Sequence, residues 1–182
     1  MAVNVAVGAK NERRTLYKSE ENLGDHKVFK THSPCGHPLL REGELVKIVG
    51  LDEFLKNRKV DLMKIDTQGW EPEVVEGAKK LIEKYKPIIF MEYSPTSYKV
   101  AKLDGNKMMN FLQNIYKKIF WIDEWLYIYK VLNKRKIDQI CNTNKTGYAD
   151  LLMKKNISFR DYINGFKDLK IKKWIKKTLF SL

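Results

Sequence analysis

Hydrophobic positions change their spacing twice between residues 60 and 91. The apolar runs at 60–65 and 88–91 have the length of strands, and the second run does not alternate with polar residues, which predicts a strand covered on both faces. Between the runs, apolar residues recur at helical spacing. Pro72 suits a first helical position and Pro87 follows the last turn, so one helix is predicted over 72–85. The pattern therefore predicts a β-α-β crossover with two parallel strands.

Shorter elements are predicted around this unit. Strands are expected at 2–7, 15–17, 27–29, 45–49, 118–121, 126–131 and 148–153, helices at 52–56, 106–116 and from 158 to the end, and a polar connection at 137–145. Strands that alternate with helices place the chain in the α/β class. With 182 residues, 43% of them hydrophobic, the chain is long enough for one domain with a real core.

A cluster of mostly polar residues, 66–71, lies between the first strand of the crossover and its helix. Ligands of open α/β sheets bind beyond the carboxyl ends of the strands. Asp66 ends one strand and Glu92 ends the next, so both carboxylates are expected at one rim, on strands about 4.8 Å apart. Gln68 can donate and accept hydrogen bonds, and Glu71 is expected at the helix entrance on that rim. Carboxylates at a helix entrance are also common caps, so a site and a structural turn both remain open.

Charge and composition narrow the range of partners. The net charge is +13, but lysines run along the whole chain, which favours solvated faces over a nucleic-acid partner. No run approaches the roughly 18 apolar residues of a membrane span. Cys35 and Cys141 are too few and too far apart for a disulfide framework, so a cytoplasmic location is expected. His32 and His37 lie near Cys35 in "HSPCGH", but this spacing matches no recognised zinc pattern, and no metal site is expected.

Residues 156–182 form a basic tail. Apolar residues at helical spacing, with Trp174 among them, predict a basic amphipathic helix. Such a helix can lie on an anionic membrane surface or pack its apolar face on the domain, and the sequence leaves both open. The lysines of the tail are Lys167, Lys170, Lys172, Lys173, Lys176 and Lys177.

Three stretches together resemble one known family. "LDEFL", then "DLMKIDTQGWEPEVVEGAKKLIEKYKPIIFMEYSP", and upstream "NVAVGAKNERRTLYKSEENLGDH" are similar to the FkbM family of S-adenosylmethionine-dependent methyltransferases. The resemblance covers residues 4–98, with a looser fit through residue 152. "KIDTQGWE" followed by "GAKKLI" is its most specific part.

The resemblance implies a Rossmann-like class I methyltransferase sheet, with 60–65 as its fourth strand and 88–91 as its fifth. It implies an enzyme that transfers a methyl group from S-adenosylmethionine to a hydroxyl of a sugar or natural product, and hence a small-molecule or glycan acceptor as partner. A base or an acceptor-orienting group is then expected among Asp66, Glu71 and His26. The residues expected around the acceptor are Gln68, Trp70, Glu92 and Tyr93, and those expected around the cofactor are Gly8 and Asp66.

The chain also departs from the family's pattern. It begins at what would be the third strand, so the fold is expected to be N-terminally truncated, without the first strands and the glycine-rich loop. Residues 1–155 are then a partial methyltransferase domain. The chain can be a fragment, a degenerate paralogue, or one half that pairs with a partner; the alternative function is a non-catalytic remnant that acts as an interaction or membrane-surface module. A sheet edge without its neighbouring strand predicts self-association.

Overall fold

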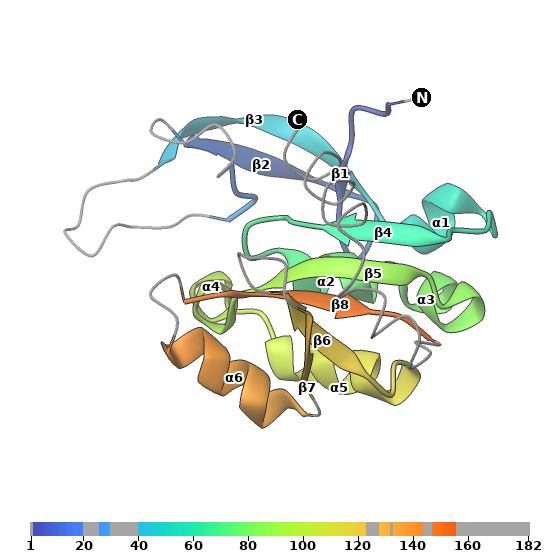
Figure 1. Cartoon of the computed structure of the whole chain (residues 1–182). Coiled ribbons are helices and arrows are strands. Elements are labelled where there is room, and N and C mark those ends of the chain that lie inside the picture. The colour runs from blue at the N-terminus through green and yellow to red at the C-terminus, as the bar shows by residue number, and fades with distance from the viewer. Residues whose placement is uncertain are drawn as a thin grey trace.

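The structure is a computed structural model that describes residues 2–19, 26–29, 40–122, 128–131, 133–143 and 147–155 (Figure 1). Its strands are β1 (Ala6–Val7), β2 (Glu12–Ser19), β3 (Leu40–Val49), β4 (Leu62–Ile65), β5 (Ile88–Tyr93), β6 (Ile119–Ile122), β7 (Ile128–Val131) and β8 (Ala149–Met153). Its helices are α1 (Leu51–Leu55), α2 (Glu71–Glu76), α3 (Lys79–Tyr85), α4 (Pro95–Ala101), α5 (Gly105–Ile115) and α6 (Lys134–Thr143). The fold is mixed α/β, as the sequence predicts.

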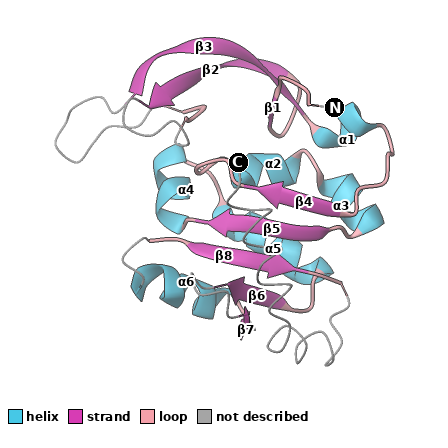
Figure 2. Ribbon diagram, turned by 45° about the horizontal axis from the view of Figure 1, so that its top comes forward, coloured by secondary structure: helices cyan, strands magenta, loops and turns pink. Residues whose placement is uncertain are grey.

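Among the residues that the structure describes, the larger sheet has five strands in the order β4-β5-β8-β6-β7 (Figure 2). β4 and β5 are parallel, with Leu62 opposite Ile88 and Ile65 opposite Met91, which confirms the predicted parallel pair. β8 is antiparallel to both β5 and β6, and β6 is antiparallel to β7. The carboxyl ends of β4 and β5 therefore share one rim of the sheet.

One face of this sheet is the main core of the protein. Ile65, Met91 and Leu151, from the three adjacent strands, are each at most 2% exposed. Helices α2, α3 and α5 cover this face (Figure 1) and contribute the buried residues Val74, Val75, Leu81, Ile82, Met109 and Leu112. The opposite, outer face of β5 is half-buried at Ile88 and Phe90, so the predicted cover is complete on one face of this strand and partial on the other. All residues of its short run at 88–91 are apolar, so the alternation between the core face and the outer face is not visible in the sequence.

The smaller sheet has the order β1-β3-β2 and arches over the larger one (Figure 1). β2 and β3 form a long antiparallel ladder, and Lys27 continues it through a bridge to Tyr17. The predicted strand at 2–7 is reduced to β1, which pairs in parallel with the end of β3. A single class I methyltransferase sheet was expected. The structure confirms an α/β fold, but its described strands form two mixed sheets.

The predicted helix over 72–85 is wrong as a single element, because it divides into α2 and α3 at Gly77 and Ala78. A Cβ atom at Gly77 would lie 2.0 Å from the carbonyl oxygen of Gly8, so the chain passes too close here for any side chain. The start of α3 is capped by a residue that is far away in sequence. Both carboxylate oxygens of Asp52 accept hydrogen bonds, from the amides of Lys80 at 3.0 Å and Leu81 at 2.8 Å.

Two further helices differ from the predictions. Residues 137–145 are not a polar connection, because most of them belong to α6, whose inward face buries Ile137 and Cys141. Helix α4 was not predicted; the Ser94 hydroxyl caps it by accepting from the Ser97 amide, and Pro95 occupies its first position. Glu92 also lies within β5 rather than directly after it.

Some predictions concern residues outside the described part of the chain. They are the helix from residue 158, with it the domain boundary at 155–156, and the loop that contains His32, Cys35 and His37. Within the described residues, no helix is long and apolar enough to cross a membrane.

Candidate active site at the carboxyl rim

The loop that follows β4 makes a tight turn. Gln68 and Gly69 have φ angles of 54° and 98°, and the amide of Trp70 donates to the carbonyl of Thr67 over 3.2 Å. Two successive positive φ values are the signature of a type I′ turn, which explains the glycine. A Cβ atom at Gly69 would also lie only 2.9 Å from the Ser97 side chain of α4. The turn is therefore fixed both by its own conformation and by packing.

The carboxylate of Glu71 holds this turn from the inside. Its Oε1 accepts from the Thr67 amide at 2.7 Å and from the Thr67 hydroxyl at 3.0 Å, and its Oε2 accepts from the Gly69 amide at 3.1 Å. The side chain is 0% exposed. Burial raises the pKa of Glu71, and the hydrogen bonds from Thr67 and Gly69 oppose that rise. Glu71 is thus at the helix entrance, as predicted, but it faces the loop backbone rather than the open rim.

Asp66 is the exposed member of the polar cluster 66–71. Its Oδ1 accepts from the Gln68 carboxamide at 3.0 Å, and its Oδ2 lies 3.3 Å from the Lys64 ammonium group. The side chain keeps 39% exposure, so a ligand can reach it. Because Lys64 neutralises part of its charge and Gln68 fixes its orientation, Asp66 is a positioned carboxylate that is open to solvent.

Two more carboxylates follow across the sheet. Glu92 on β5 lies one residue beyond the pair Ile65–Met91, on the outer face with Asp66, and Asp150 of β8 is directly opposite Glu92. The prediction that Asp66 and Glu92 share one rim is therefore confirmed by the strand register. Neighbouring strands are about 4.8 Å apart, so the three carboxylates form a row, which we call the acidic rim.

Asp150 was missed in the sequence, although an acidic residue in the apolar strand 148–153 is the same signal that pointed to Glu92. Its pKa is raised to about 6, mainly by burial and then by the negative charge of Asp66, while Lys64 lowers it. A carboxylate with this pKa is ionised near neutral pH and is more basic than an ordinary aspartate. Asp150 is thus a better candidate for a base than the sequence alone indicated.

Other predicted site residues lie away from the acidic rim. Tyr93 points to the opposite face of β5, is 1% exposed, and donates to Asp138 over 3.0 Å. Trp70 is 4% exposed, stacked at 6.2 Å on Phe29, with the Arg14 guanidinium 4.9 Å from its ring centroid. Both side chains support the site from within the protein, and their predicted contact with an acceptor stays a prediction.

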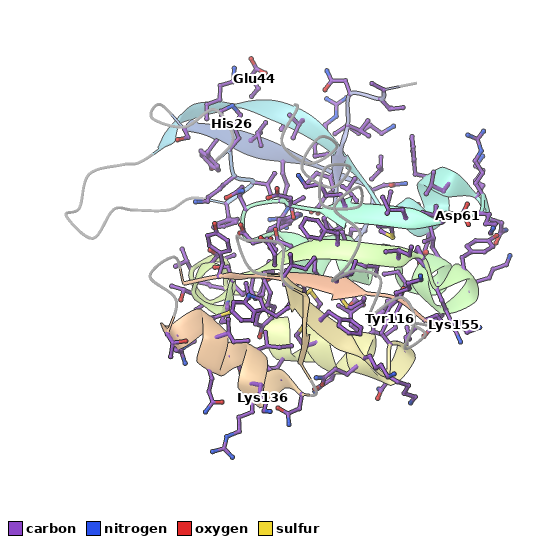
Figure 3. All side chains as sticks on the ribbon, in the orientation of Figure 1. His26, Glu44, Asp61, Tyr116, Lys136 and Lys155 are labelled. Atoms are coloured by element: carbon purple, nitrogen blue, oxygen red, sulfur yellow. The ribbon has the colours of Figure 1, made fainter. Side chains whose placement is uncertain are left out.

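His26 and Gly8 are also separate from the rim. The Nδ1 atom of His26 accepts from the Ser19 amide at 3.1 Å, and the residue lies beside the β2–β3 ladder (Figure 3). A Cβ atom at Gly8 would lie 2.8 Å from Ile48 and 3.2 Å from the indole nitrogen of Trp70, so the protein itself fills the space around it. Their predicted roles as base and cofactor contact are not tested by this geometry.

A mixed sheet with helices on its core face and polar groups at the carboxyl rim defines an α/β protein with its candidate site at that rim. The model of the FkbM methyltransferase domain matches residues 1–129, and the chain belongs to that family. No curated protein and no solved structure matches the chain at a significant level.

Proposed function

We propose that the protein is an O-methyltransferase that uses S-adenosylmethionine and methylates a hydroxyl of a sugar or natural product at the acidic rim. The family supports methyl transfer. The observation that carries the site is the row of Asp66, Glu92 and Asp150 on one face of three neighbouring strands.

The cofactor fits the chemistry of this rim. S-adenosylmethionine would supply a methyl group on a positively charged sulfonium, and the same molecule carries an ammonium group. Carboxylates are complementary to both charges, and Asp66 is exposed and oriented by Gln68. Asp66 and Gln68 are therefore the residues of the described chain that we assign to cofactor binding.

Asp150 is assigned the role of general base. The bound cofactor would supply the methyl group, and the Asp150 carboxylate would take the proton of the acceptor hydroxyl. Glu92 lies between Asp66 and Asp150 and can accept hydrogen bonds from neighbouring hydroxyls of a sugar. Glu71 acts through the turn, because its hydrogen bonds to Thr67 and Gly69 hold the loop that carries Asp66. In this assignment it is a positioning residue.

Calorimetric titration of the full chain with S-adenosylmethionine tests cofactor binding. Micromolar affinity is expected for the wild type, with at least about tenfold weaker binding for Asp66→Asn because a charge-assisted contact is lost. Asp61→Asn is the matched control. Asp61 is an exposed aspartate paired with Lys59 at 2.7 Å, but it lies at the opposite end of β4. Equal affinities for the two variants would contradict the site.

Release of S-adenosylhomocysteine in the presence of a panel of free saccharides tests the base. Asp150→Asn is expected to slow release by about 100-fold or more, the usual effect of losing a general base. The wild-type rate is expected to fall as the pH drops below about 6, where Asp150 becomes protonated. A pH profile unchanged by the substitution would remove Asp150 from the mechanism. No heat with S-adenosylmethionine at millimolar concentration would instead favour a non-catalytic interaction module.

A further inference from the structure

The end of the five-stranded sheet opposite the acidic rim gathers four connecting segments. β4, β5 and β6 all begin at this end, and β8 finishes there because it runs antiparallel to β5 and β6. The segments are 56–61, 83–87, 117–118 and 154–155, and we call them the basic end face. Asp61 and Lys155, from the first and last segments, lie at the same end of the molecule (Figure 3).

The basic end face carries nine cations against two carboxylates, Asp61 and Glu83. One of the carboxylates is already neutralised, because Lys59 lies 2.7 Å from Asp61. Within the described residues no ion pair is found for Arg58, Lys117 or Lys155, all of them exposed. The nine cations are Lys56, Arg58, Lys59, Lys84, Lys86, Lys117, Lys118, Lys154 and Lys155.

Several lysines elsewhere on the protein are held in ion pairs. Lys18 pairs with Glu44 at 2.7 Å. Lys79 and Lys107 both pair with Glu76, at 2.9 and 3.3 Å. Exposed lysines also lie on other elements, for example Lys99 on α4 and Lys136 on α6, but at this end the topology brings nine cations from four segments together. The protein is therefore polarised along its strands, acidic at the carboxyl rim and basic at the other end.

A cavity of about 320 Å³ opens between α1 and α3 beside this face. Its lining combines the cations Arg58, Lys80 and Lys84 with the leucines Leu51 and Leu81. Two carboxylates also line the cavity: Asp52 accepts from the amides that it caps, and Glu53 accepts from the Asn11 carboxamide at 2.7 Å. Cations around an apolar floor suit a ligand that has both an anionic group and a hydrocarbon part.

An exposed apolar side chain lies close to these cations. Phe54, in the helix that precedes segment 56–61, is a large apolar side chain with 42% exposure. An exposed aromatic residue beside clustered cations is typical of surfaces that bind anionic lipid.

We propose that the basic end face docks the protein on an anionic phospholipid bilayer, with a lipid phosphate received at the cavity between α1 and α3. Phe54 then enters the headgroup layer, and the surrounding cations contact lipid phosphates. The acidic rim, at the other end of the strands, faces the aqueous phase.

Co-sedimentation of the full chain with vesicles tests this docking. Wild type is expected to pellet with phosphatidylcholine vesicles that contain phosphatidylglycerol, to stay in solution with phosphatidylcholine alone, and to be released by added salt. The variant Arg58→Glu/Lys117→Glu/Lys155→Glu is expected to bind at least about tenfold more weakly, since each basic residue near the surface contributes measurably. Lys117→Glu/Lys118→Glu is a second, milder variant should the triple variant fail to fold.

The matched control is Lys99→Glu/Lys102→Glu/Lys136→Glu. These exposed lysines lie on α4, directly after α4, and on α6, and the substitutions change the net charge by the same amount. Vesicle affinity within about twofold of wild type is expected for this control, because salt screens the attraction between the bilayer and charges that lie far from it. If both triple variants lost the same amount of vesicle affinity, net charge alone would explain the binding. If the variants of the basic end face lost no affinity, the binding would be assigned to residues 156–182 alone. Release of the protein from vesicles by duplex DNA, with the same dependence on Arg58 and Lys117, would identify a nucleic-acid surface. Each of these results would overturn the proposal.

Discussion

Asp66 and Glu71 stand at the two ends of the turn between β4 and α2, and their carboxylates have opposite surroundings. Asp66 is open to solvent beside Lys64, whereas Glu71 is enclosed and accepts hydrogen bonds from Thr67 and Gly69. The sequence predicted that both would be near the rim, but it could not distinguish their roles. That distinction depends on which way the chain turns at Gln68 and Gly69, and on α4 packing against the turn.

Asp150 gives a prediction about stability at this scale. Its pKa in the folded protein, about 6, lies above the usual value of 3.8, so the folded state holds a proton between these pH values that the unfolded state has released. Stability therefore falls as the pH rises through this window. Asp150→Asn, which cannot ionise, is expected to raise the melting temperature by a few degrees near neutral pH and to change it little at about pH 4.

Thermal denaturation of wild type and variant at the two pH values measures this difference. Asp61→Asn serves again as control, because it removes an exposed carboxylate at the opposite end of β4. A lower melting temperature for Asp150→Asn near neutral pH would mean that Asp150 makes a stabilising contact in its charged form. Higher stability together with lost activity is the usual signature of a functional carboxylate that burial makes unfavourable.

At the scale of elements, the crossover from β4 to β5 was the most predictable part of the fold. Long apolar runs, a helical period and two prolines specify it locally. The division into α2 and α3 was not predictable, because Gly77 and Ala78 are acceptable inside a helix and the cause of the break lies far away in sequence. Gly8 approaches Gly77, and Asp52 caps the second helix. Helix α6 was missed because its polar residues outnumber the few that face the core, such as Ile137 and Cys141.

The distant cap leads to a prediction about the stability of α3. Asp52→Ala is expected to lower the free energy of unfolding by about 1 to 2 kcal/mol, because the amides of Lys80 and Leu81 lose their acceptor. Urea denaturation followed by circular dichroism measures this loss. Glu83→Ala, an exposed substitution on the same helix, is the control and is expected to change stability by less than about 0.5 kcal/mol. Similar effects for both variants would show that charge on α3, rather than the cap, matters.

At the scale of the whole molecule, β4 is the last strand of the larger sheet within the described residues. The carbonyl of Asp61 accepts from the Ile88 amide on β5. Because backbone direction alternates along a strand, Leu62 and Lys64 direct their N–H and C=O groups to the other edge. Such an edge is a template for another strand.

Self-association through this edge remains our prediction. Size-exclusion chromatography with light scattering is expected to show oligomers of the wild type, and Leu62→Lys is expected to shift them toward monomer, because a charge at the edge disfavours strand pairing. Leu62 is 56% exposed; the control is Val100→Lys, at a site on α4 that is 50% exposed. A monodisperse wild-type monomer would refute the prediction, and equal effects of both substitutions would point to general hydrophobic contact instead.

The polarity of the molecule along its strands has a practical side. A cation-exchange bead bears fixed negative charges, and it would hold each molecule by the segments around Arg58 and Lys117. Copies held by this end would present Asp66 and Asp150 to the flowing buffer. A column loaded in this way is an oriented array, suited to capturing cationic small molecules from a mixture.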